Sequence, residues 1–161
     1  MTVETAIAAL QPVEPAYLKV LRARAATFWL PAFIGSLVVD RLFLGEIPVA
    51  GLLPVVVGLV ALSGITIAPN RIYRRLGYAI DDRLLRVVHG WLFHTDTIVP
   101  FVRVQHIDVT RGPIDKLFGT ASLVVHTAGT HNSIIVLPGL APDRAADMRE
   151  TIRGAIRADA E

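Results

Sequence analysis

The stretch Ile98–Gly119, IVPFVRVQHIDVTRGPIDKLFG, holds the features that decide how the second half of the chain folds. Its apolar residues alternate as in a β-strand, but the alternation changes phase in the middle. Val104 and Ile107 are an odd number of positions apart, so they would point to opposite faces of a regular strand. A phase change of this kind is what a β-bulge produces. We therefore predict a bulge or sharp bend at Gln105 or His106, which would let the strand serve two sheets.

The ends of this stretch add further expectations. Pro100 has no amide hydrogen and would interrupt the ladder of a central strand, so we expect it to separate two strands. Gly112 marks a turn, and Ile114–Gly119 predicts a single helical turn. After that turn, Leu117 and Phe118 are expected to pack onto the core.

Short strands continue on both sides. The acidic pair Asp81-Asp82 separates two apolar runs and predicts a hairpin, and Gly90 closes the second run. A further hairpin is expected around Gly129-Thr130. We therefore expect roughly six short antiparallel strands, which favour a sandwich or a partly open barrel.

The C-terminal segment predicts an amphipathic helix that begins near Pro142. Its apolar residues recur at spacings of three and four, as a single stripe requires; they are Ala145, Met148, Ile152 and Ile156. The arginines lie off this stripe and are expected to be solvated; they are Arg144, Arg149, Arg153 and Arg157. The stripe is expected to cover an open end of the barrel.

The first half of the chain has a different composition. Of the 161 residues, 53% are hydrophobic and 19% are charged, and the apolar excess is concentrated in two blocks. Ile47–Ala68 contains no charge and would form a helix of about 33 Å, enough to cross a hydrocarbon core of about 30 Å. We predict a transmembrane helix over residues 47–68, with a kink at Pro54.

The block Ala25–Gly45 predicts a second transmembrane helix over residues 25–44. The pair Asp40-Arg41 interrupts its apolar run and is expected near the outer interface, where a charge costs less than at the bilayer centre. The alternative is that Asp40 takes part in a proton relay. Only a short connection through Glu46 separates the blocks, so the two spans should form a tight hairpin.

Basic residues lie before the first span and after the second; they are Lys19, Arg22, Arg24, Arg71, Arg74 and Arg75. By the positive-inside rule, both termini are expected in the cytoplasm, in a multi-pass protein of the bacterial cytoplasmic (inner) membrane. Residues 1–24 would form a cytoplasmic segment and residues 71–161 a cytoplasmic domain, with Arg71, Arg74 and Arg75 at the membrane interface. A cleaved signal peptide is not expected, because the apolar run is long and a second span follows.

The ordered motifs of the second half resemble those of the YdbS-like bacterial pleckstrin-homology (PH) domains. The motifs are Tyr78-x-Ile80-x-Asp82, Gly90, PFVRVQ at 100–105, RGPIDKLFG at 111–119 and TAG at 127–129. The likeness covers about Gly77 to Ile156, and the preceding two-span hairpin matches the usual arrangement in that family. The resemblance implies a two-helix transmembrane hairpin followed by a mainly-β PH-like domain, with bent antiparallel sheets in a partly open barrel and a C-terminal amphipathic helix.

The resemblance also carries functional expectations. It implies no enzymatic activity and no cofactor. Members often occur beside a larger membrane protein that carries several copies of the domain, so such a protein, or a second copy of this chain, is the expected partner.

Two departures from eukaryotic PH domains stand out. Those that bind phosphoinositides use a basic loop between their first two strands, whereas the acidic pair Asp81-Asp82 with one base, Arg83, holds the predicted position here. Inositol-lipid recognition is therefore not expected. The eukaryotic fold has seven strands rather than six, so either a strand lies around Trp91–His94 or the barrel is reduced.

Composition excludes several classes of site. The chain has no cysteine, which excludes disulfides, a thiol nucleophile and thiolate metal sites. A net charge of +2 is too small to indicate nucleic-acid binding. Five histidines raise the possibility of a metal site, but their spacing favours scattered polar positions, and no metal is expected; they are His89, His94, His106, His126 and His131.

No catalytic constellation is predicted. Ser122 and Ser133 lie in strand patterns without a nucleophile motif, and the acids Asp96, Asp108 and Asp115 have no pairing spacing. The expected function is therefore protein–protein assembly at the cytoplasmic face of the membrane, for example in envelope maintenance. The expected contact surface contains Arg103, Gln105 and Arg111. The alternative function is sensing of an anionic lipid or a small ligand at the membrane surface.

Overall fold

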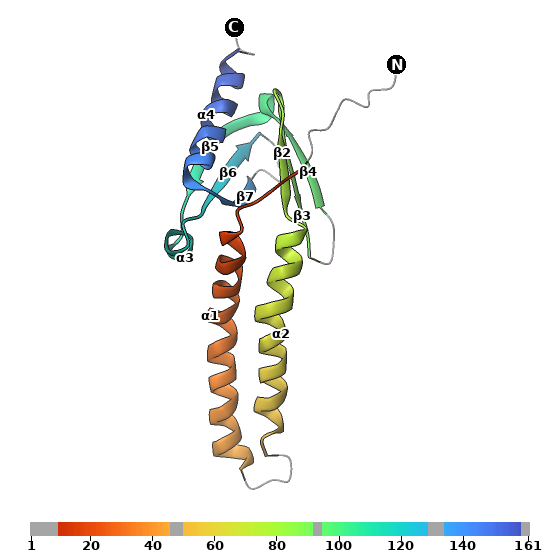
Figure 1. Ribbon diagram of the computed structural model, residues 1–161, viewed down its shortest axis with the longest axis vertical. Helices are drawn as coiled ribbons and strands as arrows, with labels where there is room; N and C mark the ends of the chain where they lie inside the picture. Colours follow the sequence, from red (N-terminus) through yellow and green to blue (C-terminus); the bar gives the residue numbers. More distant parts are fainter. Residues whose placement is uncertain (1–9, 46–49, 92–94, 129–133, 159–161) are drawn as a thin grey trace, which may run out of the picture. The chain divides into compact units, whose positions relative to one another are not determined.

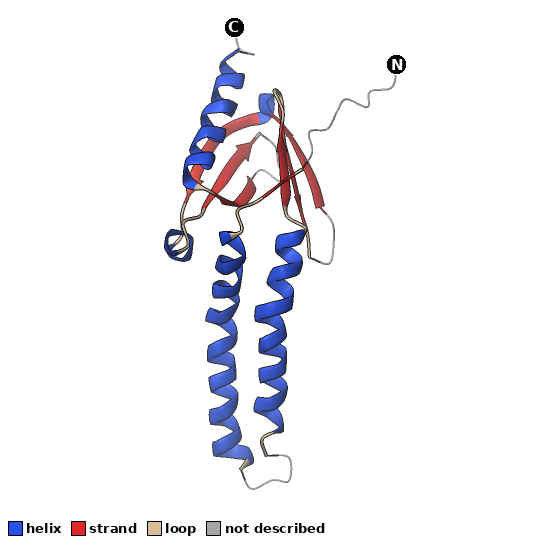
Figure 2. Ribbon diagram, viewed as in Figure 1, coloured by secondary structure: helices blue, strands red, loops and turns tan. Residues whose placement is uncertain are grey.

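The computed structural model describes residues 10–45, 50–91, 95–128 and 134–158 of the chain. The chain folds into two compact units. A β unit contains the residues up to Tyr17 and those from Ile72 onward, and a helical unit contains Leu18–Arg71. Figures 1 and 2 show the helices and strands of both units. The helical unit is thus inserted into the sequence of the β unit.

The helical unit is a pair of helices. α1 spans Ala16–Val39 and continues as the π-helix η1, Asp40–Leu44, while α2 spans Leu52–Arg74. Both are long and apolar enough to cross a membrane, and only 11% and 17% of their apolar windows are buried. The core helix of a soluble protein would bury these side chains, so their exposure favours a lipid-facing surface.

The helix ends differ from the predicted spans 25–44 and 47–68. α1 begins at Ala16 because its first turns contain lysine and arginine, which are good helix formers. α2 begins after Gly51, whose φ of 86° ends the preceding connection. Pro54 therefore lies in the first turn, where its missing amide hydrogen leaves no helical bond unmade. The predicted kink at Pro54 is wrong for this reason.

Asp40 connects the two helices at the end of the hairpin. Its side chain is buried, and Oδ1 accepts a 2.8 Å hydrogen bond from the backbone amide of Gly51. This bond satisfies an amide just before α2, which would otherwise lack a partner inside the helix. Asp40 thus has a structural role that was not predicted from the sequence, which suggested an interface charge pair or a proton relay.

Replacing Asp40 tests this role. Asp40→Ala removes the acceptor for the Gly51 amide and should destabilise the hairpin by about 1–2 kcal/mol. Asp40→Asn keeps a carbonyl oxygen at the same place and should cost less. The measurement is unfolding of the full chain in mixed micelles, followed by circular dichroism as SDS is titrated. Equal losses in the two variants would mean that the charge, and not the acceptor, matters.

The β unit contains two antiparallel sheets. Sheet A has the order β1-β2-β3-β4, with bounds Gln11–Pro12, Gly77–Ile80, Leu84–His89 and Thr95–Pro100. Sheet B has the order β5-β6-β7, with bounds Val104–Thr110, Ala121–Thr127 and Ile134–Leu140. α3 (Pro113–Leu117) connects β5 to β6, and α4 (Pro142–Ala158) follows β7. No pairing among these strands closes a barrel, and the predicted fold class is confirmed.

β1 is the strand that the sequence analysis missed. Its two residues pair with the start of β2, Gln11 with Tyr78 and Pro12 with Gly77. With β1, the described residues contain seven strands rather than six. The alternative position for a seventh strand, around Trp91, is not needed, although Leu92–His94 lie outside the described residues. The membrane hairpin therefore connects the first strand of the fold to the second.

Alternate residues of the strands supply the core. In sheet B, the row Ile107–Val125–Ile135 crosses all three strands with each side chain at most 8% exposed. In sheet A, Tyr78, Leu85, Val87 and Val99 are buried in the same manner. Ala145, Met148 and Ile152 of α4 are also buried, and Ile156 is half-buried, so the predicted stripe is confirmed for its first three members.

The bulge predicted at Gln105 or His106 is confirmed. The register of β5 against β6 shifts between Val104 and His106, which leaves Gln105 without a partner. The switch between sheets lies earlier than predicted, however. β4 ends at Pro100, and the 3-10 turn η2 (Phe101–Arg103) carries the chain from sheet A to sheet B. The expectation that one bent strand serves both sheets is therefore wrong.

Tyr78 anchors β1 and α4 to sheet A. Its ring is 2% exposed, and the Arg144 guanidinium lies 5.7 Å from its centre. Burial raises the pKa of the Tyr78 phenol above its usual value of 10.0. Arg144 also donates a hydrogen bond to Oε1 of Gln11. One arginine of the predicted solvated face thus connects the first strand to the last helix.

Gly139 of β7 allows the N-terminal segment to pack on sheet B. Its φ is +75°, and a Cβ atom there would lie 2.5 Å from Cγ of Tyr17. Gly119 also has a positive φ, +68°, but a Cβ would meet nothing within 4 Å. Gly139 therefore combines a conformational requirement with a steric one.

Three glycine-to-alanine variants separate these requirements. Gly119→Ala should cost about 1–2 kcal/mol through its backbone alone. Gly139→Ala should cost more, because it also displaces Tyr17. Gly154→Ala, in open space on α4, should instead stabilise the helix by up to about 1 kcal/mol. The measurement is denaturant unfolding of the full chain in mild detergent; a Gly139 variant no worse than the Gly119 variant would contradict the packing of Tyr17.

Candidate functional site

The outer face of sheet B, opposite to the core, combines exposed apolar side chains with titratable ones. Two rows cross the three strands of this face; they are His106–His126–Ile134 and Asp108–Val124–Val136. These six residues are called the outer face below. Each row alternates with a row of the core, because successive residues of a strand point to opposite sides.

Three polar residues of the outer face form one cluster. Oδ1 of Asp108 lies 2.9 Å from Nε2 of His106, and Oδ2 lies 3.5 Å from Nε2 of His126. The two imidazole rings are 5.8 Å apart. Because all three side chains are at least 36% exposed, such contacts are worth about 0–1 kcal/mol each. The cluster therefore makes this part of the outer face polar but contributes little to the stability of sheet B.

The described residues offer little support for a metal site. No group of three or more His, Cys, Asp or Glu among them is arranged to hold a metal ion. His89 is exposed at the end of β3, apart from the cluster. His94, His131 and Ser133 lie outside the described residues.

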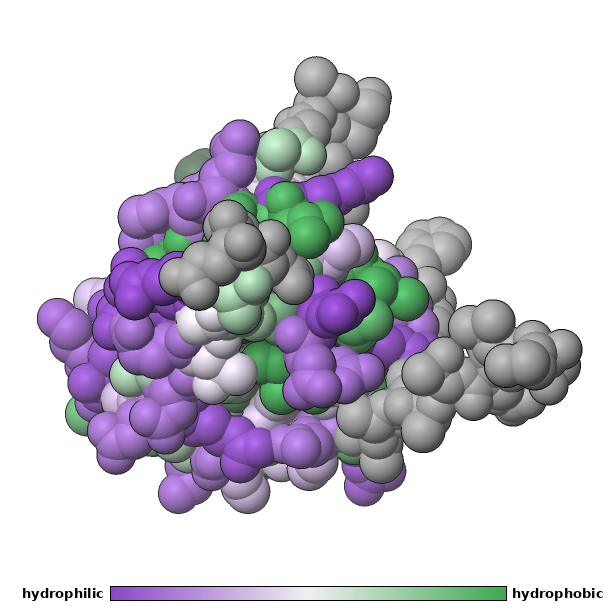
Figure 3. Space-filling model, turned by 90° about the horizontal axis from the view of Figure 1, so that it is seen from above, coloured by the Kyte–Doolittle hydropathy of each residue, from purple (hydrophilic) through white to green (hydrophobic). Residues whose placement is uncertain are grey.

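The apolar part of the outer face lies on an edge strand. Ile134 is 55% exposed and Val136 is 47% exposed, both on β7. β7 ends the order of sheet B, and no other described strand pairs with its outer edge, although near its end the Gly139 carbonyl accepts a bond from the Glu14 amide. An unpaired edge with apolar neighbours is a common place for another chain to bind. Figure 3 shows a face of the molecule on which hydrophobic residues lie among predominantly hydrophilic ones.

The structure does not bring the predicted contact residues together. Arg103 ends η2 and Gln105 forms the bulge, and both are exposed. Arg111 lies beyond the other end of β5, about 20 Å from Gln105 at the rise of a strand. Its Nε donates a 3.2 Å hydrogen bond to the carbonyl oxygen of Thr120. Arg111 thus supports the turn that contains α3, at the opposite end of β5 from Gln105.

Asp115 organises the same turn. Asp115 is the third residue of the short α3 and is 3% exposed, and its carboxylate accepts hydrogen bonds from the Gly112 amide at 3.2 Å and from Oγ1 of Thr120 at 3.1 Å. Phe118 is half-buried, but Leu117 is 77% exposed. The prediction that Leu117 packs onto the core is therefore wrong, because α3 turns this side chain outward.

The remaining candidate acid, Asp96, is paired on the surface of sheet A. Its Oδ1 lies 2.9 Å from Nε of Arg86 in the neighbouring strand, and both oxygens contact the guanidinium. The hydrogen bond to Asp96 raises the pKa of the Arg86 guanidinium. Asp96 thus belongs to a cross-strand ion pair. The candidate nucleophile Ser122 is buried in β6, with 9% of its surface exposed.

The predicted interface arginines lie around α2 and the start of β2. Arg74 and Arg75 line a hollow of about 200 Å³ together with Leu10–Pro12, Leu76, Gly77 and Val88. Nη1 of Arg75 donates a 2.6 Å hydrogen bond to the carbonyl oxygen of Trp91. Arg71 belongs to the helical unit. Two of the three predicted residues therefore share one site.

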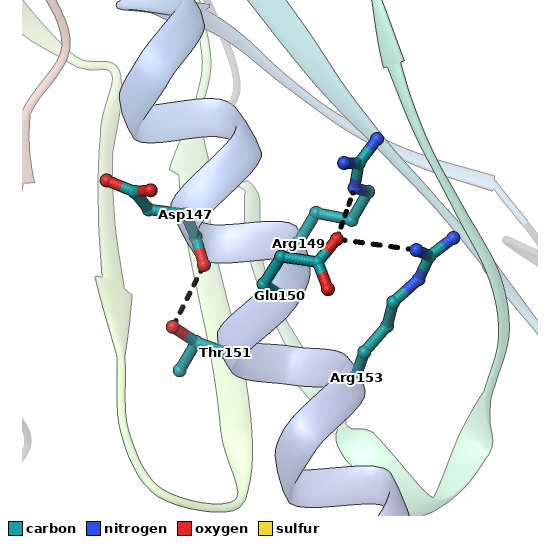
Figure 4. Close-up of polar contacts among 5 residues, drawn as sticks. All are labelled: Asp147, Arg149, Glu150, Thr151 and Arg153. Carbon is teal, nitrogen blue, oxygen red and sulfur yellow. Dashed lines mark hydrogen bonds and ion pairs between the residues drawn. The ribbon is translucent and has the colours of Figure 1, made fainter.

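The charged face of α4 is largely satisfied by its own residues. Figure 4 shows the Glu150 carboxylate between Arg149 and Arg153, at 3.1 and 3.4 Å. Oγ1 of Thr151 donates a 2.9 Å bond to the carbonyl oxygen of Asp147 one turn earlier. These exposed contacts are typical of a solvated helix face, as predicted.

The architecture defines the class of protein. Two helices suited to a membrane are inserted between the first two strands of a β unit, whose four-stranded and three-stranded sheets are followed by a C-terminal helix. These are the features of a membrane protein with a PH-like domain.

Comparison with known proteins gives the family. The family model of the bacterial PH domain matches residues 25–156, and the chain belongs to this family. Over 104 residues the chain is 31% identical to the UPF0699 transmembrane protein YdbS of Bacillus subtilis (strain 168). That match covers 65% of this chain and 64% of YdbS. No solved structure matches the chain. The predicted resemblance to YdbS-like bacterial PH domains is thereby confirmed.

The position of the hairpin corrects the comparison with eukaryotic PH domains. Asp81-Asp82 lies between β2 and β3, where the Asp81 amide bonds to the Leu84 carbonyl at 3.0 Å. The connection between the first two strands is the membrane hairpin itself, with its flanking basic residues. The acidic turn therefore carries no information about the loop that eukaryotic domains use for phosphoinositides.

Proposed function

We propose that this chain is a non-enzymatic, membrane-anchored PH-like module for protein–protein assembly at the cytoplasmic face of the bacterial cytoplasmic membrane. In this proposal both helices cross the membrane and both termini are cytoplasmic, which the basic residues beside the spans favour. The partner is a second copy of the chain or a larger membrane protein with related PH-like domains. We propose envelope maintenance as the cellular process, because the protein would be located at the membrane.

The observation that carries the proposal is the edge strand β7 with its exposed Ile134 and Val136. A partner strand along this edge would extend sheet B through main-chain hydrogen bonds, and its side chains would cover the two apolar residues. The anchor favours such a contact further, because confinement to one membrane raises the effective concentration of the partners.

The state of the candidate catalytic residues supports a non-enzymatic role. Asp96 is engaged by Arg86, Asp108 by two histidines and Asp115 by the turn of α3. Each carboxylate thus has a structural partner on a different part of the β unit. In the described part of the β unit these carboxylates are therefore held apart, whereas an acid and a base would have to face one reacting group.

A second candidate function rests on the hollow beside Arg74 and Arg75. The guanidinium groups of Arg74 and Arg75, at the C-terminal end of α2, would suit a lipid phosphate. Its volume of about 200 Å³ is below the roughly 300–1,000 Å³ typical of small-molecule sites. The alternative function is therefore sensing of an anionic lipid headgroup. Sensing of a small ligand is less favoured, because the hollow is smaller than a typical small-molecule site.

The assembly proposal predicts the effect of charging the edge. Ile134→Lys/Val136→Lys should abolish cross-linking to the partner in intact membranes and co-purification in mild detergent, because two ammonium groups on an edge strand oppose pairing. Val102→Lys, at a side chain that is 75% exposed on η2, is the matched control and should leave both unchanged.

Two results would count against assembly through this edge. One is a cross-linked product that persists in the Ile134→Lys/Val136→Lys variant. The other is co-purification of one class of anionic lipid without any protein, lost on Arg74→Ala/Arg75→Ala. The second result would support lipid sensing instead.

A further inference from the structure

Several large apolar side chains of the described β unit are exposed outside the outer face of sheet B; they are Leu10, Trp91, Ile98, Val102 and Leu117. Trp91, just after β3, is 51% exposed, and Leu117, at the end of α3, is 77% exposed. Packing in the core explains neither position, and the proposed assembly edge includes neither. The topology nevertheless brings both to one end of the β unit.

The position of Leu117 follows from sheet B. α3 precedes Ala121 at the start of β6, and Ala121 pairs with Leu140 at the end of β7. The neighbouring Gly139 packs against Tyr17, the last residue of the β unit before the chain enters the helical unit. Within the β unit, α3 therefore lies at the same end of sheet B as Tyr17.

The position of Trp91 follows from sheet A. Gly77 begins β2 soon after α2 ends, and it pairs with Val88, three residues before Trp91. The carbonyl oxygen of Trp91 accepts a 2.6 Å hydrogen bond from Nη1 of Arg75. Trp91 is thus held beside the point where the chain returns from the second span.

Both points are close to the hydrocarbon boundary along the chain. α2 continues from Ala68, the last residue of the apolar block, to Arg74, a rise of about 9 Å. Within α1, Tyr17 precedes the apolar block at Ala25 by a rise of about 12 Å. With the membrane boundary of the proposed function at Ala25 and Ala68, these rises along the chain are of the same order as the thickness of a headgroup region.

The chemistry of this end suits a lipid surface. Tryptophan is enriched where a protein meets the membrane interface, since its ring is apolar and its indole N–H is polar. Lys116 precedes Leu117 in the sequence, and Arg75 bonds to Trp91, so each apolar side chain has a basic neighbour that attracts anionic headgroups. Charge and apolarity together favour a bilayer as the occupant.

We infer that Trp91 and Leu117 insert into the interface of the bilayer and form a second attachment of the β unit, additional to the two spans. The turn that presents Leu117 is preorganised, since buried Asp115 and the bond from Arg111 to Thr120 fix it. Such an attachment would restrict the orientation of the β unit relative to the membrane. The inference rests on the proposed anchoring by the two spans, and not on the proposed assembly through the edge of β7.

Spin labels test the position of Leu117. The chain has no cysteine, so Leu117→Cys and the control Val102→Cys each give one labelling site of nearly equal exposure, 77% and 75%. Val102 lies at the other end of sheet B, next to the partners Val104 and Thr127. The full-length variants are labelled and reconstituted into vesicles of phosphatidylcholine and phosphatidylglycerol, and collisions with oxygen and with a water-soluble nickel chelate are measured by electron paramagnetic resonance.

Tryptophan fluorescence tests Trp91 in the same vesicles. Trp29→Phe leaves Trp91 as the sole tryptophan, and a phenyl ring can still pack on Gly64 as Trp29 does. The emission of Trp91 is then quenched with lipids brominated near the headgroup and, separately, with aqueous iodide.

The inference expects a label at 117 that collides preferentially with oxygen, a label at 102 that collides preferentially with the chelate, and Trp91 emission quenched by brominated lipid more than by iodide. It is overturned if the labels at 117 and 102 behave alike, or if iodide quenches Trp91 as it quenches free tryptophan. Protection from the chelate without contact with oxygen or brominated lipid would also overturn it, and would assign this end to a protein partner.

Discussion

The pairing of β1 with β2 is the contact on which the rest of the structure depends. Pro12 and Gly77 are register partners, although the whole membrane hairpin separates them in the sequence. The segment that follows β1 is also held to the last strand, since the Glu14 amide donates a 2.8 Å bond to the Gly139 carbonyl and Tyr17 packs on the same glycine. A few residues before the first span thus join both sheets of the β unit.

The membrane hairpin makes this pairing less costly. Closing a flexible loop of the same length would cost roughly 4 kcal/mol of chain entropy. The paired helices remove much of that cost, because Arg22 of α1 bonds to Asn70 of α2 at 3.3 Å and so brings the two flanks of the hairpin together. Insertion of the hairpin should therefore precede and promote completion of the β unit. The bacterial PH family match, over residues 25–156, includes α2, most of α1 and the strands β2 to β7, but begins after β1.

Sequence reasoning succeeded where one pattern dominated. The charge-free block predicted a membrane helix, the phase slip predicted the bulge at Gln105, and the stripe of α4 predicted its buried side. It failed where the signal was tertiary. Two residues, Gln11 and Pro12, show no strand periodicity, and only their partners in β2 make them a strand. The run at 134–137 is apolar throughout, so it could not show that Ile134 and Val136 are exposed while Ile135 and Leu137 are buried. The contacts of Asp108 with two histidines likewise required the register of β5 against β6.

The central claim is that the PH-like fold is completed across the membrane hairpin, and a disulfide can test it directly. A Cβ at Gly77 would lie 3.4 Å from Cβ of Leu10, close to the roughly 3.5–4.5 Å of a disulfide. Leu10→Cys/Gly77→Cys should therefore cross-link under mild oxidation in isolated membranes, and mass spectrometry should find the two tryptic peptides joined. Leu10→Cys/Val102→Cys should not cross-link, because Gly77 and Val102 lie at opposite ends of β3. Gly77 pairs with Val88 at one end, and Pro100, two residues before Val102, pairs with Leu84 at the other. Absence of the first cross-link, or equal formation of both, would contradict a fold in which β1 completes sheet A.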